Sequence, residues 1–197
     1  YLNSSTINLT GFAQFTGGGT KFCWSMFSSP SNYTTLDAGS STIKIQNSAN
    51  DDITFSANDY ASIYNNIWVD RGASTGKTTF AVRTNNLTIG ELRDTTISTH
   101  SLLFDPGFDY YFSIFNVNGS AGNIITIDRS SGATQIPFNI TAPVYLNYVA
   151  VRNNYGNPDN SWYVNAANST LVNTTQWYFG TPPVTGGLKK LALLGVG

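Results

Sequence analysis

The chain has 197 residues, a formal net charge of −1 and only 11% charged side chains, against 41% hydrophobic and 14% aromatic residues. A chain of this length buries roughly 70% of its unfolded surface, so it can form a core without a disulfide or a metal. The ten lysines and arginines form no basic stripe, which argues against nucleic-acid binding, and no run of 18 apolar residues indicates membrane insertion of the mature chain.

The N-terminal segment 1–15 alternates between two kinds of residue. Ile7, Leu9, Gly11, Ala13 and Phe15 fall on one face of an extended strand, because side chains in a strand alternate with a period of two. A Gly-rich hinge at 16–20 follows it. Two interpretations remain open: an ordinary first strand, or a donor strand that completes the sheet of a neighbouring subunit.

Strand signals fill the chain after this hinge, and helical periodicity is almost absent. The patterns predict strands at 20–27, 41–46, 53–56, 61–69, 78–83, 96–104, 109–117, 123–127, 144–151, 161–164 and 176–179. The apolar run 188–197 is expected to form a late strand. Turn clusters rich in Gly, Pro, Asn and Ser separate these segments.

About ten to twelve short strands at this spacing predict an all-β fold, in the form of an immunoglobulin-like or jelly-roll β-sandwich. The sequence indicates no internal repeat and no domain boundary within 21–197, which is therefore expected to be one sandwich head domain.

Eight Asn-x-Ser/Thr sequons occur, all without proline at the middle position. Such sequons accept N-linked glycans in secreted proteins, where each glycan must lie outside the core. The asparagines are Asn3, Asn8, Asn32, Asn86, Asn118, Asn139, Asn168 and Asn173. Together with a surface of hydroxyls and amides in place of charges, they predict an extracellular or cell-surface glycoprotein.

No arrangement of residues predicts catalysis, and we expect neither an enzyme nor a cofactor. His100 is the only histidine and Cys23 the only cysteine, so a zinc site built on several such ligands is not available. His100 is interpreted as a structural histidine and Cys23 as a small buried hydrophobe. The aspartates Asp51, Asp52, Asp59 and Asp70 lack the spacing of a calcium loop, and turn capping is the favoured interpretation.

The stretch Ile-Asn-Leu-Thr-Gly-Phe-Ala-Gln-Phe at 7–15, the glycines behind it and the sequon-rich body resemble the pilin-like subunits of archaeal thread filaments. These subunits are similar in architecture to bacterial type I pilins. The resemblance implies a pilin-like sandwich with an N-terminal donor strand, a homopolymeric filament of copies of this chain, glycosylation, and a role in adhesion or cell–cell contact. The single cysteine departs from bacterial type I pilins, which usually carry a disulfide.

Two other functions remain as alternatives. The pairs Tyr110–Tyr111, Trp162–Tyr163 and Trp177–Tyr178 could supply rings for a secreted carbohydrate-binding or adhesin domain, with one ring of each pair inward and one outward. A virion capsid or spike protein with a jelly roll is the other alternative.

Overall fold

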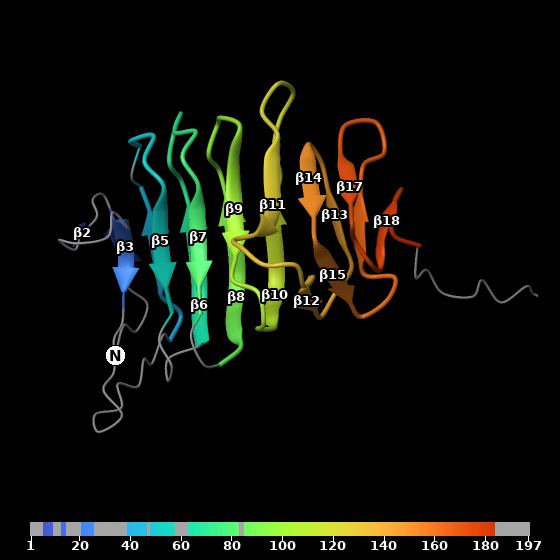
Figure 1. Cartoon of the computed structure of the whole chain (residues 1–197), viewed down its shortest axis with the longest axis horizontal. Helices are drawn as coiled ribbons and strands as arrows, with labels where there is room; N and C mark the ends of the chain where they lie inside the picture. Colours follow the sequence, from blue (N-terminus) through green and yellow to red (C-terminus); the bar gives the residue numbers. More distant parts are fainter. Residues whose placement is uncertain are drawn as a thin grey trace, which may run out of the picture.

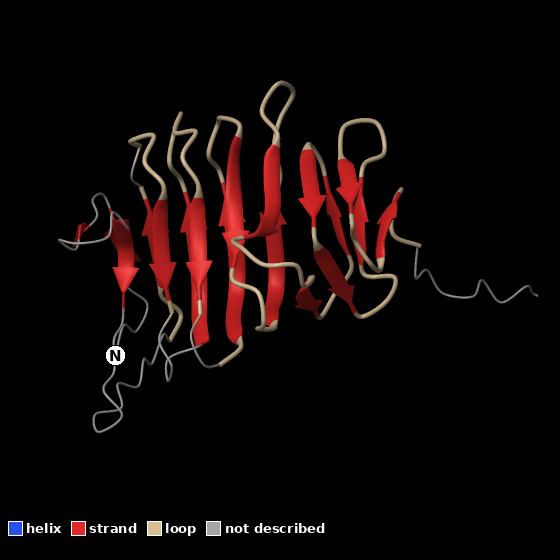
Figure 2. Cartoon of the chain, in the orientation of Figure 1, coloured by secondary structure: helices blue, strands red, loops and turns tan. Residues whose placement is uncertain are grey.

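The computed structural model describes residues 6–9, 13–14, 21–25, 39–46, 48–57, 63–82 and 85–183. Within these residues all of the regular structure is strand and none is helix, as Figure 2 shows, so the predicted all-β class is confirmed. The strands are β1 (Thr6–Leu9), β2 (Ala13–Gln14), β3 (Lys21–Ser25), β4 (Thr42–Ile45), β5 (Ile53–Ser56), β6 (Ile63–Val69), β7 (Thr78–Ala81), β8 (Leu87–Asp94), β9 (His100–Phe104), β10 (Tyr110–Val117), β11 (Ile125–Arg129), β12 (Ile136–Ile140), β13 (Val144–Leu146), β14 (Val149–Arg152), β15 (Asn154–Asn157), β16 (Trp162–Val164), β17 (Thr170–Val172) and β18 (Trp177–Phe179).

The strands form three sheets in which almost every pair is parallel. The first sheet has the order β1-β4-β6-β8-β10-β12-β15, the second β17-β14-β11-β9-β7-β5-β3-β2, and the third β13-β16-β18. Successive strands of one sheet are therefore separated in sequence by a strand of another, so the chain winds as a coil. The coils stack along the long axis from the blue end to the red end (Figure 1), which makes the fold a parallel β-solenoid of about 5 turns.

This architecture corrects the predicted immunoglobulin-like, pilin-like or jelly-roll sandwich. A sandwich needs mainly antiparallel strands, whereas here only the short β2–β3 pair is antiparallel among the named strands. Period-two alternation places side chains inside or outside a strand but does not tell which neighbour the strand pairs with. The strand rhythm was therefore interpreted correctly and the pairing wrongly.

The prediction that the chain contains no internal repeat was also wrong. Ile43 pairs with Ile67, and Ile67 pairs with Leu92, so an apolar residue recurs once per coil at a nearly constant spacing. In the second sheet Phe55 pairs with Phe80, and Phe80 with Phe104, at the same spacing. Each coil buries its apolar face only against its neighbours, which is the physical reason for a repeat that is one coil long.

The N-terminal segment takes part in this stack. The backbone of β1 pairs in parallel with β4 of the same chain, with Thr6 opposite Thr42 and Leu9 opposite Ile45. The donor-strand interpretation of this segment is therefore wrong, because the strand occupies the edge of its own sheet. Ile7 and Leu9 lie in β1 and Ala13 in β2, whereas Gly11, Phe15 and the predicted hinge 16–20 lie outside the described residues.

A column of aromatic rings runs through the core. Trp24 stacks on Phe55 at 5.9 Å between ring centroids, and the column continues through Phe80 to Phe104, whose rings lie 5.0 Å apart. Beyond Phe104 the rings are Phe138, Trp162 and Trp177, at centroid distances of 4.7, 5.8 and 4.7 Å. Ring contacts therefore link the early coils to the last one.

The prediction of individual strands was correct for most of the chain and missed four segments. The predicted ranges contain β3 to β7, β9, β10, β16 and β18. The range 123–127 contains the first three residues of β11, and the range 144–151 contains all of β13 and most of β14, with a corner between them. The missed strands are β8, β12, β15 and β17. The predicted strand at 188–197 lies outside the described residues.

Replacing Phe80 by Ala should destabilise the fold by about 3–5 kcal/mol, the usual cost of deleting a buried ring. Phe80 is fully buried between Phe55 and Phe104. Urea unfolding followed by circular dichroism measures the change. Phe179→Ala is the matched control, because that ring is 54% exposed and its loss should change the free energy of unfolding little. Equal losses for the two variants would contradict the aromatic column as a source of stability.

Candidate functional site

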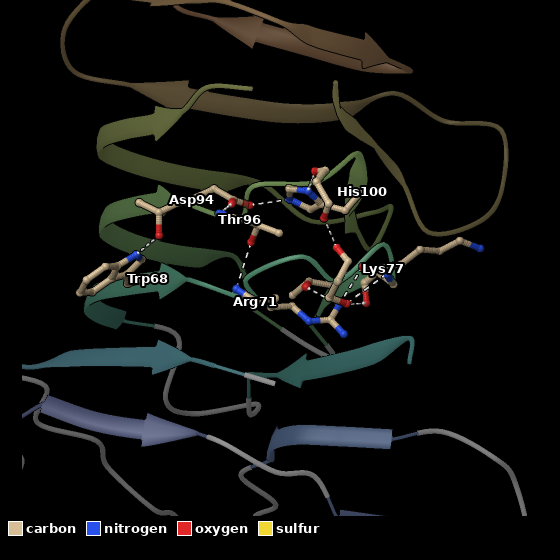
Figure 3. A network of polar contacts seen from close by, with 11 residues as sticks. Trp68, Arg71, Lys77, Asp94, Thr96 and His100 are labelled. Carbon is tan, nitrogen blue, oxygen red and sulfur yellow. Dashed lines mark hydrogen bonds and ion pairs between the residues drawn. The ribbon is translucent and has the colours of Figure 1, made fainter. Parts of the chain in front are cut away.

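A network of buried charged side chains lies at a corner of the solenoid, between the first and second sheets (Figure 3). Arg71, which follows β6, is fully buried there. Its guanidinium donates to the carbonyls of Ala49 and Asp51 in the preceding coil at 2.9 and 2.6 Å, and to those of Gly76 and Lys77 in its own coil at 2.8 and 3.1 Å. Burial lowers the pKa of Arg71, and the nearby aspartates act against that shift. The Arg71 side chain therefore links the corners of two successive coils by hydrogen bonds.

Asp94 and His100 form a buried ion pair in the next coil, 2.8 Å apart between Oδ2 and Nε2 (Figure 3). The other carboxylate oxygen accepts from the backbone N–H of Thr96 at 2.8 Å. Nδ1 of His100 lies 2.7 Å from the carbonyl oxygen of Ser98, which can only accept, so the imidazolium form satisfies both contacts. Burial acts to lower the pKa of His100, but the bond to Asp94 and its charge, together with the Ser98 carbonyl, raise it above its ordinary value.

This cluster has the composition of a catalytic dyad but not its geometry. The second nitrogen of His100 contacts a backbone carbonyl, so no nucleophile is aligned with the ring. Both side chains of the Asp94–His100 pair are fully buried, so no substrate reaches them. Among the residues that the structure describes, no group of three or more His, Cys, Asp or Glu side chains could hold a metal. The interpretation of His100 as a structural histidine is thus supported.

The pair predicts a pH dependence of stability. The folded pKa of His100 is raised, so its contribution is fully present below the unfolded value of about 6.5 and is lost as the pH rises through the folded pKa. The midpoint of urea unfolding should therefore fall as the pH rises above about 6.5, and His100→Gln should remove this component of the slope. No other histidine contributes. Burial raises the pKa of the Cys23 thiol to about 12, which places its titration above this window. An identical slope in both proteins would contradict the assignment.

The outer face of the first sheet is more accessible than this buried corner. Its strand pairing is irregular at the same point along β6, β8 and β10. Ser113 and Ile114 of β10 are both exposed although they are adjacent, and neither Ser113 nor Gly90 of β8 has a partner in the register. A side chain at Gly90 would lie 2.4 Å from the carbonyl oxygen of Asn65 in β6, so only glycine fits there. The kink turns extra side chains of β10 toward solvent.

Two hollows adjoin this kink and share Ser113 and Ile140 in their walls. The first, about 360 Å³, is lined by Tyr111, Phe112, Thr88, Ser113, Asn139, Ile140, Thr141 and Pro158. The second, about 370 Å³, is lined by Ser113, Ile114, Phe115, Asn116, Asn118, Ile140, Ala142, Pro143, Val144 and Tyr145. None of these lining side chains is charged, so the hollows combine apolar walls with neutral donors and acceptors.

Hydrogen bonds hold the polar wall of the first hollow in place. Asn139 lies opposite Tyr111 in the register and donates to the Tyr110 carbonyl at 3.4 Å, while its Oδ1 accepts from Asn157 at 2.6 Å. Tyr111 is 39% exposed, and its hydroxyl donates to Asp109 at 3.3 Å. The ring is thus positioned by its own hydroxyl and stands beside a row of amides.

A third hollow of about 190 Å³ lies further along the same sheet, over β4, β6 and β8, and is lined by Thr42, Asn66, Ile67, Trp68, Glu91 and Arg93. Trp68 is held between two cations: Lys44 Nζ lies 3.8 Å and Arg93 Cζ 4.6 Å from its ring centroid. Its indole N–H donates to Thr95 at 2.7 Å. Polar and aromatic side chains therefore extend over five neighbouring strands of this face.

The structure places five of the sequon asparagines at turns or on outward positions. Asn86, Asn118 and Asn173 are exposed, and Asn139 and Asn168 are half-buried. Asn86, Asn118 and Asn168 accept backbone N–H bonds from Asp109, Asn147 and Tyr148 of the next or preceding coil. Asn3 and Asn32 lie outside the described residues, and only the backbone of Asn8 is described, in β1. Glycosylation stays a prediction at all eight.

The remaining candidates are scattered. Asp52 accepts a hydrogen bond from the backbone N–H of Lys77 at 2.9 Å and Asp70 pairs with Lys44 at 2.8 Å, whereas Asp59 lies outside the described residues.

For the aromatic pairs, the prediction of one inward and one outward ring is confirmed for Tyr110 and Tyr111 but wrong for Trp162 and Tyr163, whose rings are both buried. The sequence analysis did not predict that Trp68, Arg93 and Asn139 lie on the same face of one sheet. Apolar residues recur once per coil, and aligning the coils on that recurrence would have placed these three residues together.

Comparison with protein-family models, with curated proteins and with solved structures finds no match. The class of protein is therefore defined by the fold alone, a parallel β-solenoid. Over the described residues no helix is long and apolar enough to cross a membrane.

Proposed function

We propose that this chain is a glycan-binding adhesive β-solenoid that takes a carbohydrate on the outer face of its first sheet. The observation that carries the proposal is the pair of adjoining uncharged hollows around Tyr111, Ser113 and Ile114. An exposed aromatic ring beside several amides and hydroxyls suits a polyhydroxylated ligand. The C–H edges of a sugar carry partial positive charge and face the negative surface of the ring, while its hydroxyls meet the amides.

The shape of the face supports a chain-like ligand. Strands of the first sheet lie about 4.8 Å apart, so the five strands from β4 to β12 present their outer side chains over about 19 Å along the solenoid axis. Rows of residues that are partners in the register, such as Tyr111–Asn139–Asn157, run in the same direction, across the strands. A ligand lying along the axis would meet one side chain from each coil in turn.

A filament formed by donor-strand exchange is not proposed, because β1 is already paired with β4. Self-association into a homopolymer, extracellular localisation and glycosylation stay predictions from the sequence. These three predictions are compatible with an adhesive function, because an extracellular solenoid with a binding face on its side can present that face to a cell surface.

Tyr111→Ala should weaken binding of a neutral oligosaccharide by about tenfold, the usual range for one aromatic contact. A glycan array identifies the oligosaccharide, and isothermal titration with the wild-type chain and the variant measures the change. Phe179→Ala removes another exposed ring from a strand of the third sheet and should leave affinity unaltered. Absence of any oligosaccharide ligand for the folded wild-type chain would overturn the proposed function.

Two sequon asparagines line the hollows, Asn139 the first and Asn118 the second. A glycan attached at either would occupy the space that the ligand needs. Passing glycosylated material over the immobilised ligand should therefore retain molecules unmodified at these sites and let modified ones flow through. Glycopeptide mapping of both fractions measures this, and Asn173, which lines neither hollow, should show the same occupancy in each. Equal occupancy of Asn139 in the two fractions would contradict the placement of the site.

A further inference from the structure

We propose that the hollow beside Trp68 and Arg93 takes a carboxylate of the bound carbohydrate, so that the ligand is an acidic glycan that bears uronic-acid units. This inference rests on the proposed function and names the substrate class of the same face. The site is the third hollow, lined by Thr42, Asn66, Trp68, Glu91 and Arg93 together with Ile67.

Among the described residues of this face, Arg93 is a cation that remains available to a ligand. Lys44 is already neutralised by Asp70, at 2.8 Å between Nζ and Oδ2. Arg93 is exposed and forms no ion pair within the part of the chain that the structure describes. Its guanidinium lies against the ring of Trp68, at 4.6 Å from the ring centroid. An accessible guanidinium without a carboxylate partner is a site of positive potential on a chain that carries few charges.

The indole ring orders this guanidinium in advance. Trp68 is fixed by its bond to Thr95 and by Lys44 at its ring, so the ring that supports Arg93 has little freedom. A guanidinium held against an aromatic ring keeps its N–H groups free at its edge, and two of them match the two oxygens of a carboxylate. Holding the fork in place before binding reduces the entropy lost on binding.

The position of Arg93 connects this hollow to the neutral ones. Arg93 lies opposite Asn116 in the register of β8 and β10, and Asn116 lines the second hollow. Glu91 lies opposite Ile114 in the same pair of strands. Tyr111 lies opposite Thr88, five positions before Arg93 along β8. A glycan whose sugar ring stacks near Tyr111 can therefore extend along β10 through the second hollow and place an acidic unit near Asn116, where Arg93 and the amide of Asn116 can both donate to it. The negative charge of Glu91 opposes binding of a carboxylate, so a neutral variant of Glu91 serves as a control.

The test compares oligosaccharides of uronic acids with the same oligosaccharides after reduction of their carboxyl groups to alcohols, using titration calorimetry at two salt concentrations. The wild-type chain should prefer the acidic form and lose that preference as salt rises. Arg93→Gln should weaken binding of the acidic form about tenfold or more, the range for a charge-assisted bond, and leave the reduced form unaffected. Glu91→Gln should strengthen binding of the acidic form alone. Arg152→Gln, an exposed arginine on the second sheet, should change neither.

The outcomes separate this inference from the proposed function. Equal affinity for the acidic and reduced forms, or an Arg93→Gln variant that binds the acidic form as wild type does, overturns the carboxylate site while Tyr111→Ala can still support the neutral one. Failure of the wild-type chain to bind either form, or any glycan on an array, overturns both. Thermal unfolding of each variant checks folding, and a normal melting temperature is expected because Arg93 is exposed.

Discussion

The stacking of one coil on the next constrains every inward position of this protein. Parallel strands in register place like positions of successive coils about 4.8 Å apart, so a residue and its counterpart one coil later must pack directly against each other. Phe55, Phe80 and Phe104 meet this requirement with rings of the same size. Gly90 meets it in the opposite way, since the carbonyl of Asn65 leaves no room for a side chain there.

The same constraint explains why charged groups are buried at one corner. Strand ladders pair backbone groups between coils, but at a corner the carbonyls turn out of the ladder and need other donors. Arg71 supplies several N–H groups to four such carbonyls in two coils. Its charge needs compensation nearby, and the inward column Ile45, Val69, Asp94 carries an aspartate in the coil that follows Arg71. Asp51 and Asp52 add negative charge near Arg71, and the buried His100 donates a hydrogen bond to the Asp94 carboxylate.

The sequence allowed the strands to be predicted where alternation is strong, as in β6 and β10, because inside and outside are set locally. It did not allow the fold to be predicted, since each strand pairs with a strand that lies a whole coil away in the chain. The phenylalanines at 55, 80 and 104 recur once per coil and were the evidence for a repeat in the sequence. The rings of the later coils occur at other spacings, so the repeat is hard to recognise there. β8 was missed because Gly90 and Glu91 interrupt its apolar alternation, at the level where the sheet kinks.

The candidate site lies where this regularity ends. Phe112 pairs with Ile140, which is further along the chain than the partners in earlier coils, whereas Phe138 pairs with Gly156, which is much closer, so the coil changes size between β10 and β15. The third sheet begins there with β13. Ala142 and Pro143, which precede this strand, and Val144 and Tyr145 within it form one wall of the second hollow. Regular coils present a flat face, because every outer side chain lies directly above its counterpart. A change of cross-section breaks that alignment and opens space between β10 and the next coil. The outer positions escape the stacking constraint, so at this break the fold can tolerate an exposed tyrosine, an exposed isoleucine and side-chain amides, which a ligand can use.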